Sequence, residues 1–179
     1  MHSSLDRFIG RVRSTWSPLT SDLVASARVG LEALANAQAQ EAWLAALLAK
    51  APASEELHRD PDFGFVLLGH TEHEGLYRPP HDHGRAWVVY AVQHGEVEMR
   101  TFARVDAGEG GFRLVQRDAR ILRAGEAQAY LPGDIHDTRC LSASALLFRF
   151  TERDLRHEDR VEGRLARYPE PQDGWTCNR

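Results

Sequence analysis

A succession of short apolar runs in the second part of the chain most narrows the folds that it can adopt. Segments rich in Val, Phe, Tyr and Leu alternate there with Gly, Pro and Asp. The runs are Phe63–His70, Trp87–Gln93, Glu96–Val105, Phe112–Arg117, Ala127–Leu131 and Ala143–Phe150. Closely spaced short strands separated by turn residues are typical of an all-β sandwich or barrel. We therefore predict a mostly β fold for this part of the chain.

The preceding segment has a helical pattern instead. Apolar residues recur at helical spacing over Leu23–Leu34 and again over Trp43–Leu48, in an Ala-rich stretch with few β-branched residues. After residue 152 the composition becomes strongly charged. We predict a helical N-terminal extension at 1–52 that packs on the barrel, a β-barrel at 53–152 and a charged C-terminal tail on the surface at 153–179.

Charge and apolar content restrict the partners. The net charge of −4 gives no global positive field, so nucleic acid is not the expected partner. No apolar run resembles a signal peptide or a membrane span, which favours a cytoplasmic protein without a membrane partner. A chain of 179 residues can bury a core without a structural metal, so a bound ion would serve function. A small-molecule partner fits this best, and a homodimer stays open.

Two histidine motifs carry the chemistry. The first is His81-Asp-His83, preceded by Gly75 and Pro80, and alternate residues of a strand point to the same face. The second is Pro-Gly-Asp-Ile-His136, in which a histidine follows a tight turn. An H-x-H pair alone is a weak signal, but a barrel brings distant strands face to face. We predict that His81, His83 and His136 are metal ligands, with coordination positions left open.

Together the two motifs resemble those of the cupins, over about Phe63 to Phe150. The resemblance implies a double-stranded β-helix, the cupin or jelly-roll barrel, with the α-helical extension before it. In two respects the motifs differ from the general pattern. The glutamate that usually follows the second histidine is replaced by Trp87 or Val88, and the second proline directly precedes its glycine.

Three histidines without the glutamate are similar to the ligand set of the thiol-dioxygenase branch, that is, cysteine dioxygenase and its bacterial relatives. That branch also has an H-D-H motif and a helical N-terminal segment. The resemblance implies one mononuclear non-heme Fe(II), with O₂ and a chelating substrate in the open positions. Zn(II), Ni(II) and Mn(II) also suit neutral imidazole ligands.

The last strand differs from that branch. Those enzymes place a histidine and a tyrosine, one residue apart, on the strand after the third ligand, where this chain offers Phe148 and Phe150. Phenylalanine can neither donate nor accept the hydrogen bond that tyrosine supplies. We therefore predict an apolar pocket bounded by Trp87, Phe148 and Phe150, and no oxidation of cysteine. Arg149, between the phenylalanines, should face the opposite side.

Three arginines are candidates to bind a substrate carboxylate, because a guanidinium offers bidentate geometry and stays charged. They are Arg59, Arg78 and Arg85. A solvated surface position is the alternative for each of them.

Other polar residues lie close to the motifs. His70 or His73 can supply a fourth ligand, although a partly exposed histidine is the alternative. Asp82 and Asp134 flank the ligands and can orient the imidazoles, with stabilisation of a turn as the alternative.

Two functions follow from these patterns. The first is a mononuclear metal-dependent cupin enzyme, a non-heme iron dioxygenase acting on a small organic acid or thiol. The second is a non-catalytic cupin that binds a small molecule or acts as a sensor. Cupin folds host several reactions, so the fold alone does not choose between them.

Overall fold

The computed structural model describes residues 2–108, 111–168 and 176–177. Three helices come first, followed by nine strands, a short helix and a last short strand. The elements are α1 (Ser4–Thr15), α2 (Ser21–Ala35), α3 (Ala42–Lys50), β1 (Glu55–Arg59), β2 (Val66–His73), β3 (Tyr77–His81), β4 (Val88–His94), β5 (Glu96–Gly108), β6 (Gly111–Arg123), β7 (Ala127–Tyr130), β8 (Ile135–Cys140), β9 (Ser144–Thr151), α4 (Leu155–Arg160) and β10 (Thr176–Cys177).

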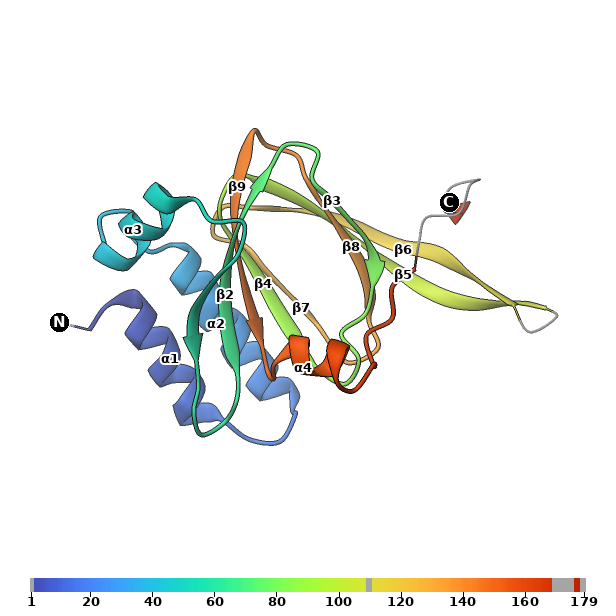
Figure 1. The fold of residues 1–179 in the computed structure, drawn as a ribbon, viewed down its shortest axis with the longest axis horizontal. Coiled ribbons are helices and arrows are strands. Elements are labelled where there is room, and N and C mark those ends of the chain that lie inside the picture. Colours follow the sequence, from blue (N-terminus) through green and yellow to red (C-terminus); the bar gives the residue numbers. More distant parts are fainter. Residues whose placement is uncertain (1, 109–110, 169–175, 178–179) are drawn as a thin grey trace.

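The strands form two five-stranded sheets that face each other (Figure 1). One has the order β1-β2-β9-β4-β7 and the other β10-β6-β5-β8-β3. All neighbouring strands pair antiparallel except β10, which lies parallel to β6. Neighbours such as β2 and β9 are far apart in sequence, as in a jelly roll. The predicted fold class, a mostly β double-stranded β-helix with an N-terminal helical region, is confirmed.

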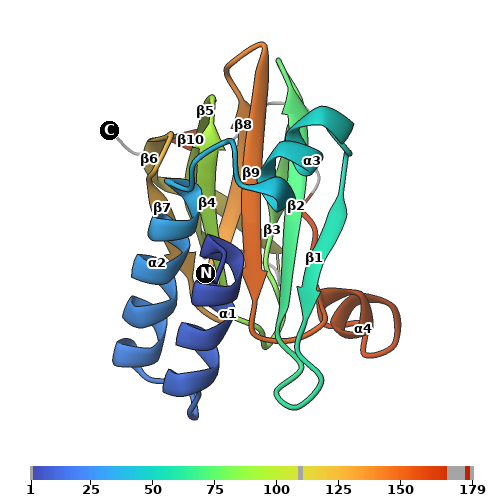
Figure 2. The same cartoon turned by 90° about the vertical axis from the view of Figure 1, so that its left-hand side faces the viewer.

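The helices cover the outer face of the first sheet, where α1 and α2 lie across β4 and β9 (Figure 2). The side chains between them form one apolar cluster that includes Phe8, Leu31, Trp87, Phe148 and Phe150. Helix α1, which the sequence analysis did not predict, begins with a capping box. Its Ser3 hydroxyl accepts from the backbone N–H of Asp6, and the Asp6 carboxylate accepts from that of Ser3. The N-terminal segment therefore packs on the barrel.

A second cluster fills part of the space between the sheets. It joins residues of both, among them Val88, Tyr90, Met99 and Leu147. Along β4 the side chains alternate, so Val88, Tyr90 and Val92 face the interior while Val89 and Ala91 face the helices. The first sheet is thus apolar on both faces.

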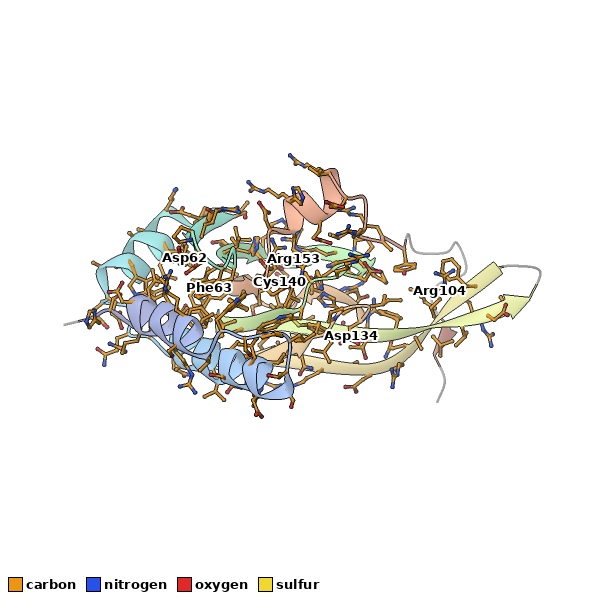
Figure 3. All side chains as sticks on the ribbon, turned by 90° about the horizontal axis from the view of Figure 1, so that it is seen from below. Asp62, Phe63, Arg104, Asp134, Cys140 and Arg153 are labelled. Atoms are coloured by element: carbon orange, nitrogen blue, oxygen red, sulfur yellow. The ribbon has the colours of Figure 1, made fainter. Side chains whose placement is uncertain are left out.

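Strands β5 and β6 extend beyond the barrel as a long hairpin (Figure 1). Arg104 lies far out on this hairpin (Figure 3), with its guanidinium 4.1 Å from the ring centroid of the exposed Phe112. No helix among the described residues is long and apolar enough to cross a membrane.

Residues that follow the barrel pack against it. Residues 164–168, which follow helix α4, lie against the end of β3 and the turn after it, where His81 and His83 are located. Ala166 accepts a backbone hydrogen bond from Asp82, at 3.0 Å, and Tyr168 donates one to Pro80, at 2.8 Å. Gly84 has a φ of +62°, and a Cβ there would lie 3.2 Å from the carbonyl oxygen of Arg164, so this close approach suits glycine. Residues 155–168 thus lie on the surface of the barrel, with most side chains exposed or half-buried, and the buried Tyr168 anchors their end.

Candidate metal centre

Two strands of the second sheet bring the histidines together. His81 is the last residue of β3, and its Cα partner across the antiparallel β3–β8 pair is His136. Residues that face each other directly across such a pair have neighbouring side chains, so the backbone register fixes this contact. His83 lies two residues past His81, in the loop after β3 rather than on the strand. The loop returns its side chain to the same cluster.

The three imidazoles converge on one point. One ring nitrogen of each lies within 4.8 Å of those of the other two. The Nε2 atoms of His83 and His136 are 3.4 Å apart, and the ring centroids of His81 and His136 are 4.7 Å apart. The predicted cluster of His81, His83 and His136 therefore exists as a geometric unit.

The hydrogen bonding of His81 identifies the nitrogen that it offers. Its Nδ1 lies 2.8 Å from the carbonyl oxygen of Pro79, which can only accept, so Nδ1 carries the proton. The free lone pair is then on Nε2. Because the carbonyl fixes both tautomer and ring orientation, His81 has the kind of support that metal-ligating histidines usually have.

Burial keeps the rings neutral. His83 and His136 are almost fully buried, and desolvation lowers the pKa of both well below the usual value. The charge of Arg149 lowers them further. Burial also lowers the pKa of His81, against the opposing hydrogen bond to Pro79. Three neutral imidazoles are the donor set that a divalent transition metal requires, so the residues fit such an ion.

Asp82 and Asp134 do not orient these rings. The Asp82 carboxylate accepts from the backbone N–H groups of Gly84 and Ala166, and that of Asp134 accepts from Leu131 at 2.7 Å. Both stabilise turns, the alternative reading of the sequence. The Nδ1 atoms of His83 and His136 are buried and have no hydrogen-bond partner within the described residues.

Two tyrosines complete the surroundings of the histidines. The Tyr130 ring stacks on His136, with centroids 4.0 Å apart, and its hydroxyl donates to the sulfur of Met99. The Tyr90 hydroxyl lies 3.3 Å from Nε2 of His83. Burial raises the pKa of Tyr90, although the charge and hydrogen bond of Arg149 oppose this shift. Tyr90 is not among the site residues predicted from the sequence, and its position on the inward face of β4 is what brings it to the histidines.

Two large cavities border this centre. One, of about 600 Å³, lies against α4 and residues 165–168, and His81 and His83 form part of its wall. The other, of about 430 Å³, lies against residues 53–54 and the end of β2. Arg78, His81 and Arg149 line both cavities.

The structure brings one of the three predicted arginines to the cavities. Arg78, on β3, lines both and forms an ion pair of 2.8 Å with the buried Glu72. Arg59 is exposed on β1 and pairs with Glu56 and Asp154, and Arg85 is exposed in the turn after His83. Arg59 and Arg85 line neither large cavity, so the structure does not bring them to the histidine cluster.

The predicted apolar wall is also wrong. Trp87, Phe148 and Phe150 have 1%, 0% and 0% of their surface exposed, within the cluster under the helices. Arg149 lies between the two phenylalanines on β9 and faces the interior instead, as their alternation requires. The side of the cavity at β9 is therefore cationic, and sequence reasoning missed this residue because both faces of the sheet are apolar.

Comparison with known proteins gives matches of structure only. No family model matches the chain, and no curated relative does. KdgF from Halomonas sp. is 20% identical, with a TM-score of 0.43, over 56% of this chain and 80% of its own. An oxalate oxidase is 22% identical, with a TM-score of 0.44, over 56% of this chain and about half, 51%, of its own. The cupin domain of Schizosaccharomyces pombe Cnp3 is 10% identical, with a TM-score of 0.45, over 61% of this chain and 69% of its own.

Proposed function

We propose that the protein is a mononuclear metal-dependent enzyme of the non-heme iron dioxygenase type, acting on a small organic acid or thiol. The observation that carries this is the convergence of three neutral imidazoles, one half-buried and two buried, with ligand nitrogens within 4.8 Å of one another, beside a cavity of about 600 Å³. His81, His83 and His136 would hold the ion. Fe(II) fits these donors, and Zn(II), Ni(II) and Mn(II) fit them as well.

In this proposal the ion and the residues around the histidines have separate roles. When bound, a ferrous ion supplies redox chemistry toward dioxygen. Arg149 and Arg78 hold and orient a substrate carboxylate, since both line the two cavities next to His81. The buried Tyr90 keeps its proton, because its pKa is raised, and its hydroxyl can donate a hydrogen bond beside His83.

Because the cavities are polar, cysteine is no longer excluded as a substrate. The prediction that cysteine is not a substrate was based on Phe148 and Phe150, which lie under the helices. The cavities instead contain Arg149 and Tyr90, groups that can bind a carboxylate and handle a proton. Cysteine therefore belongs in the test panel beside cysteamine, 3-mercaptopropionate and small hydroxy acids.

Metal analysis tests the centre. Each of His81→Ala, His83→Ala and His136→Ala should lose most of the metal that the wild type holds, while circular dichroism shows a retained fold. His94→Ala removes a histidine outside the cluster and should keep the metal. Wild-type metal in all three cluster variants would refute the proposed centre.

Oxygen uptake tests the reaction. The protein reconstituted anaerobically with Fe(II) should consume O₂ with one member of the panel, and His136→Ala should not. A protein that binds metal and ligand but consumes no O₂ would support the alternative, a non-catalytic metal-dependent binding or sensor cupin.

A further inference from the structure

Four of the residues that line the smaller cavity, of about 430 Å³, carry an unpaired buried polar atom. The atoms are His70 Nε2, Glu72 Oε2, Thr138 Oγ1 and Arg149 Nε, each buried and without a hydrogen-bond partner in the described part of the chain. All four residues line this cavity. A buried polar group without a partner is costly, so four around one cavity indicate that a polar occupant completes them.

Existing contacts define what each atom can do. His70 Nδ1 lies 3.3 Å from the carbonyl oxygen of Ala53, so Nδ1 carries the proton and Nε2 accepts. Burial, with the charges of Arg149 and Arg78, lowers the pKa of His70 to about 3, so the ring is neutral at pH 7. Glu72 Oε1 accepts from Arg78 at 2.8 Å, which leaves Oε2 as a second acceptor.

The other two atoms add donors. Arg149 Nε can only donate, and the Thr138 hydroxyl can both donate and accept. The residues that line the cavity thus carry two unpaired acceptors, one unpaired cationic donor and one unpaired hydroxyl, next to the imidazole of His81. An occupant must donate at least twice and accept from a guanidinium. Hydroxyl groups donate and accept at once, and a carboxylate is the acceptor that best matches arginine.

We propose that this smaller cavity is a subsite for a polyhydroxylated small acid, whose hydroxyl groups donate to His70 Nε2 and Glu72 Oε2 and bond to the Thr138 hydroxyl, and whose carboxylate accepts from Arg149. The cavity volume is in the range of small-molecule sites. The identification of this acid as the substrate of the metal centre rests on the proposed function. Binding in the cavity does not, because none of the four unpaired atoms belongs to a histidine of the cluster.

Thr138→Val is the most informative variant. It replaces an unpaired buried hydroxyl with a methyl group of similar size, so the free energy of unfolding should stay equal or rise. Thr151→Val is the matched control, because Thr151 is equally buried, donates to the carbonyl oxygen of Val66 and lines neither large cavity. Glu72→Gln tests the second acceptor.

The test is calorimetric titration of the metal-free full chain with gluconate, hexanoate and sorbitol. We expect gluconate to bind, and hexanoate and sorbitol to bind at least about tenfold more weakly, since each lacks one half of the recognised chemistry. Thr138→Val and Glu72→Gln should each weaken gluconate binding by about tenfold, and Thr151→Val should not. No binding of gluconate, equal binding of hexanoate, or insensitivity to Thr138→Val would overturn the proposal and assign water alone to the cavity. Binding of gluconate without metal retention or O₂ uptake would support the subsite and refute the proposed enzyme.

Discussion

His70 should make the protein sensitive to acid by an amount that can be worked out. Burial is the main cause that lowers the pKa of its imidazole from 6.5 to about 3. Between these values the unfolded chain binds a proton that the folded chain does not, so stability falls as the pH drops. The loss is about 1.4 kcal/mol per pH unit once the unfolded histidine is protonated, or about 2 kcal/mol between pH 7 and pH 5.

His70→Gln removes this titration. The free energy of unfolding of the wild type should fall by about 2 kcal/mol more than that of the variant between pH 7 and pH 5. Urea unfolding of chelator-treated protein at both pH values measures the difference, and the three clustered histidines cancel because both proteins contain them. His73→Gln, which removes an exposed histidine from the same strand, controls for the substitution itself. An equal pH dependence for wild type and His70→Gln would show that His70 takes up a proton as readily in the folded as in the unfolded chain, and would refute the reasoning.

Three further predictions concern the stability of the fold. Gly95→Ala should lower the free energy of unfolding, measured with urea, by about 2–5 kcal/mol, because φ is +83° and the new Cβ would lie 2.8 Å from Cα of Ala145. Gly133→Ala, at φ +85° in open space, should lower it by about 1–2 kcal/mol. Equal losses in the two variants would contradict the geometry. Phe148→Ala should cost about 3–5 kcal/mol and leave the metal content of the folded protein unchanged, and a loss of metal from folded protein would return this residue to the cavity wall. Asp82→Ala should lower the free energy of unfolding by about 1–3 kcal/mol, because two backbone N–H groups lose their acceptor. Asp82→Asn keeps an acceptor oxygen and should retain most of the stability. Similar losses in both variants would count against Asp82 as the acceptor that stabilises this turn.

Much of the barrel was predictable because its strands are short, apolar and separated by turn residues. The six predicted runs all overlap observed strands, but β5 and β6 extend further, since polar residues continue their hairpin beyond the core. Strands β1, β3 and β8 are not among these runs because their sequences, EELHR, YRPPH and IHDTRC, contain few apolar residues, and β10 has only two residues. Helix α1 was missed because its apolar stripe of Leu5, Phe8, Ile9 and Val12 lies among many charged residues.

The histidine cluster was predictable, and the cavity wall was not. The cluster depends on motif spacing, which the β3–β8 register preserves. The wall depends on which face of β9 points inward. Alternation separates Arg149 from Phe148, but it cannot assign the faces when helices make the outer one apolar. Tyr90 was missed for the same reason.

The way in which residues 155–168 join the barrel has a consequence for how such a protein can evolve. Several of them, among them Leu155, Leu165 and Tyr168, line the larger cavity, and all of them follow β3 and β8 in the sequence. Two backbone–backbone hydrogen bonds join Ala166 to Asp82 and Tyr168 to Pro80, and the Asp82 carboxylate accepts a third bond from the backbone N–H of Ala166. Substitutions, insertions or exchange of this segment can therefore reshape the cavity without moving a histidine or a strand. Proteins descended from this chain can thus change the small molecule that they bind by changes in this one contiguous segment, while the barrel stays the same.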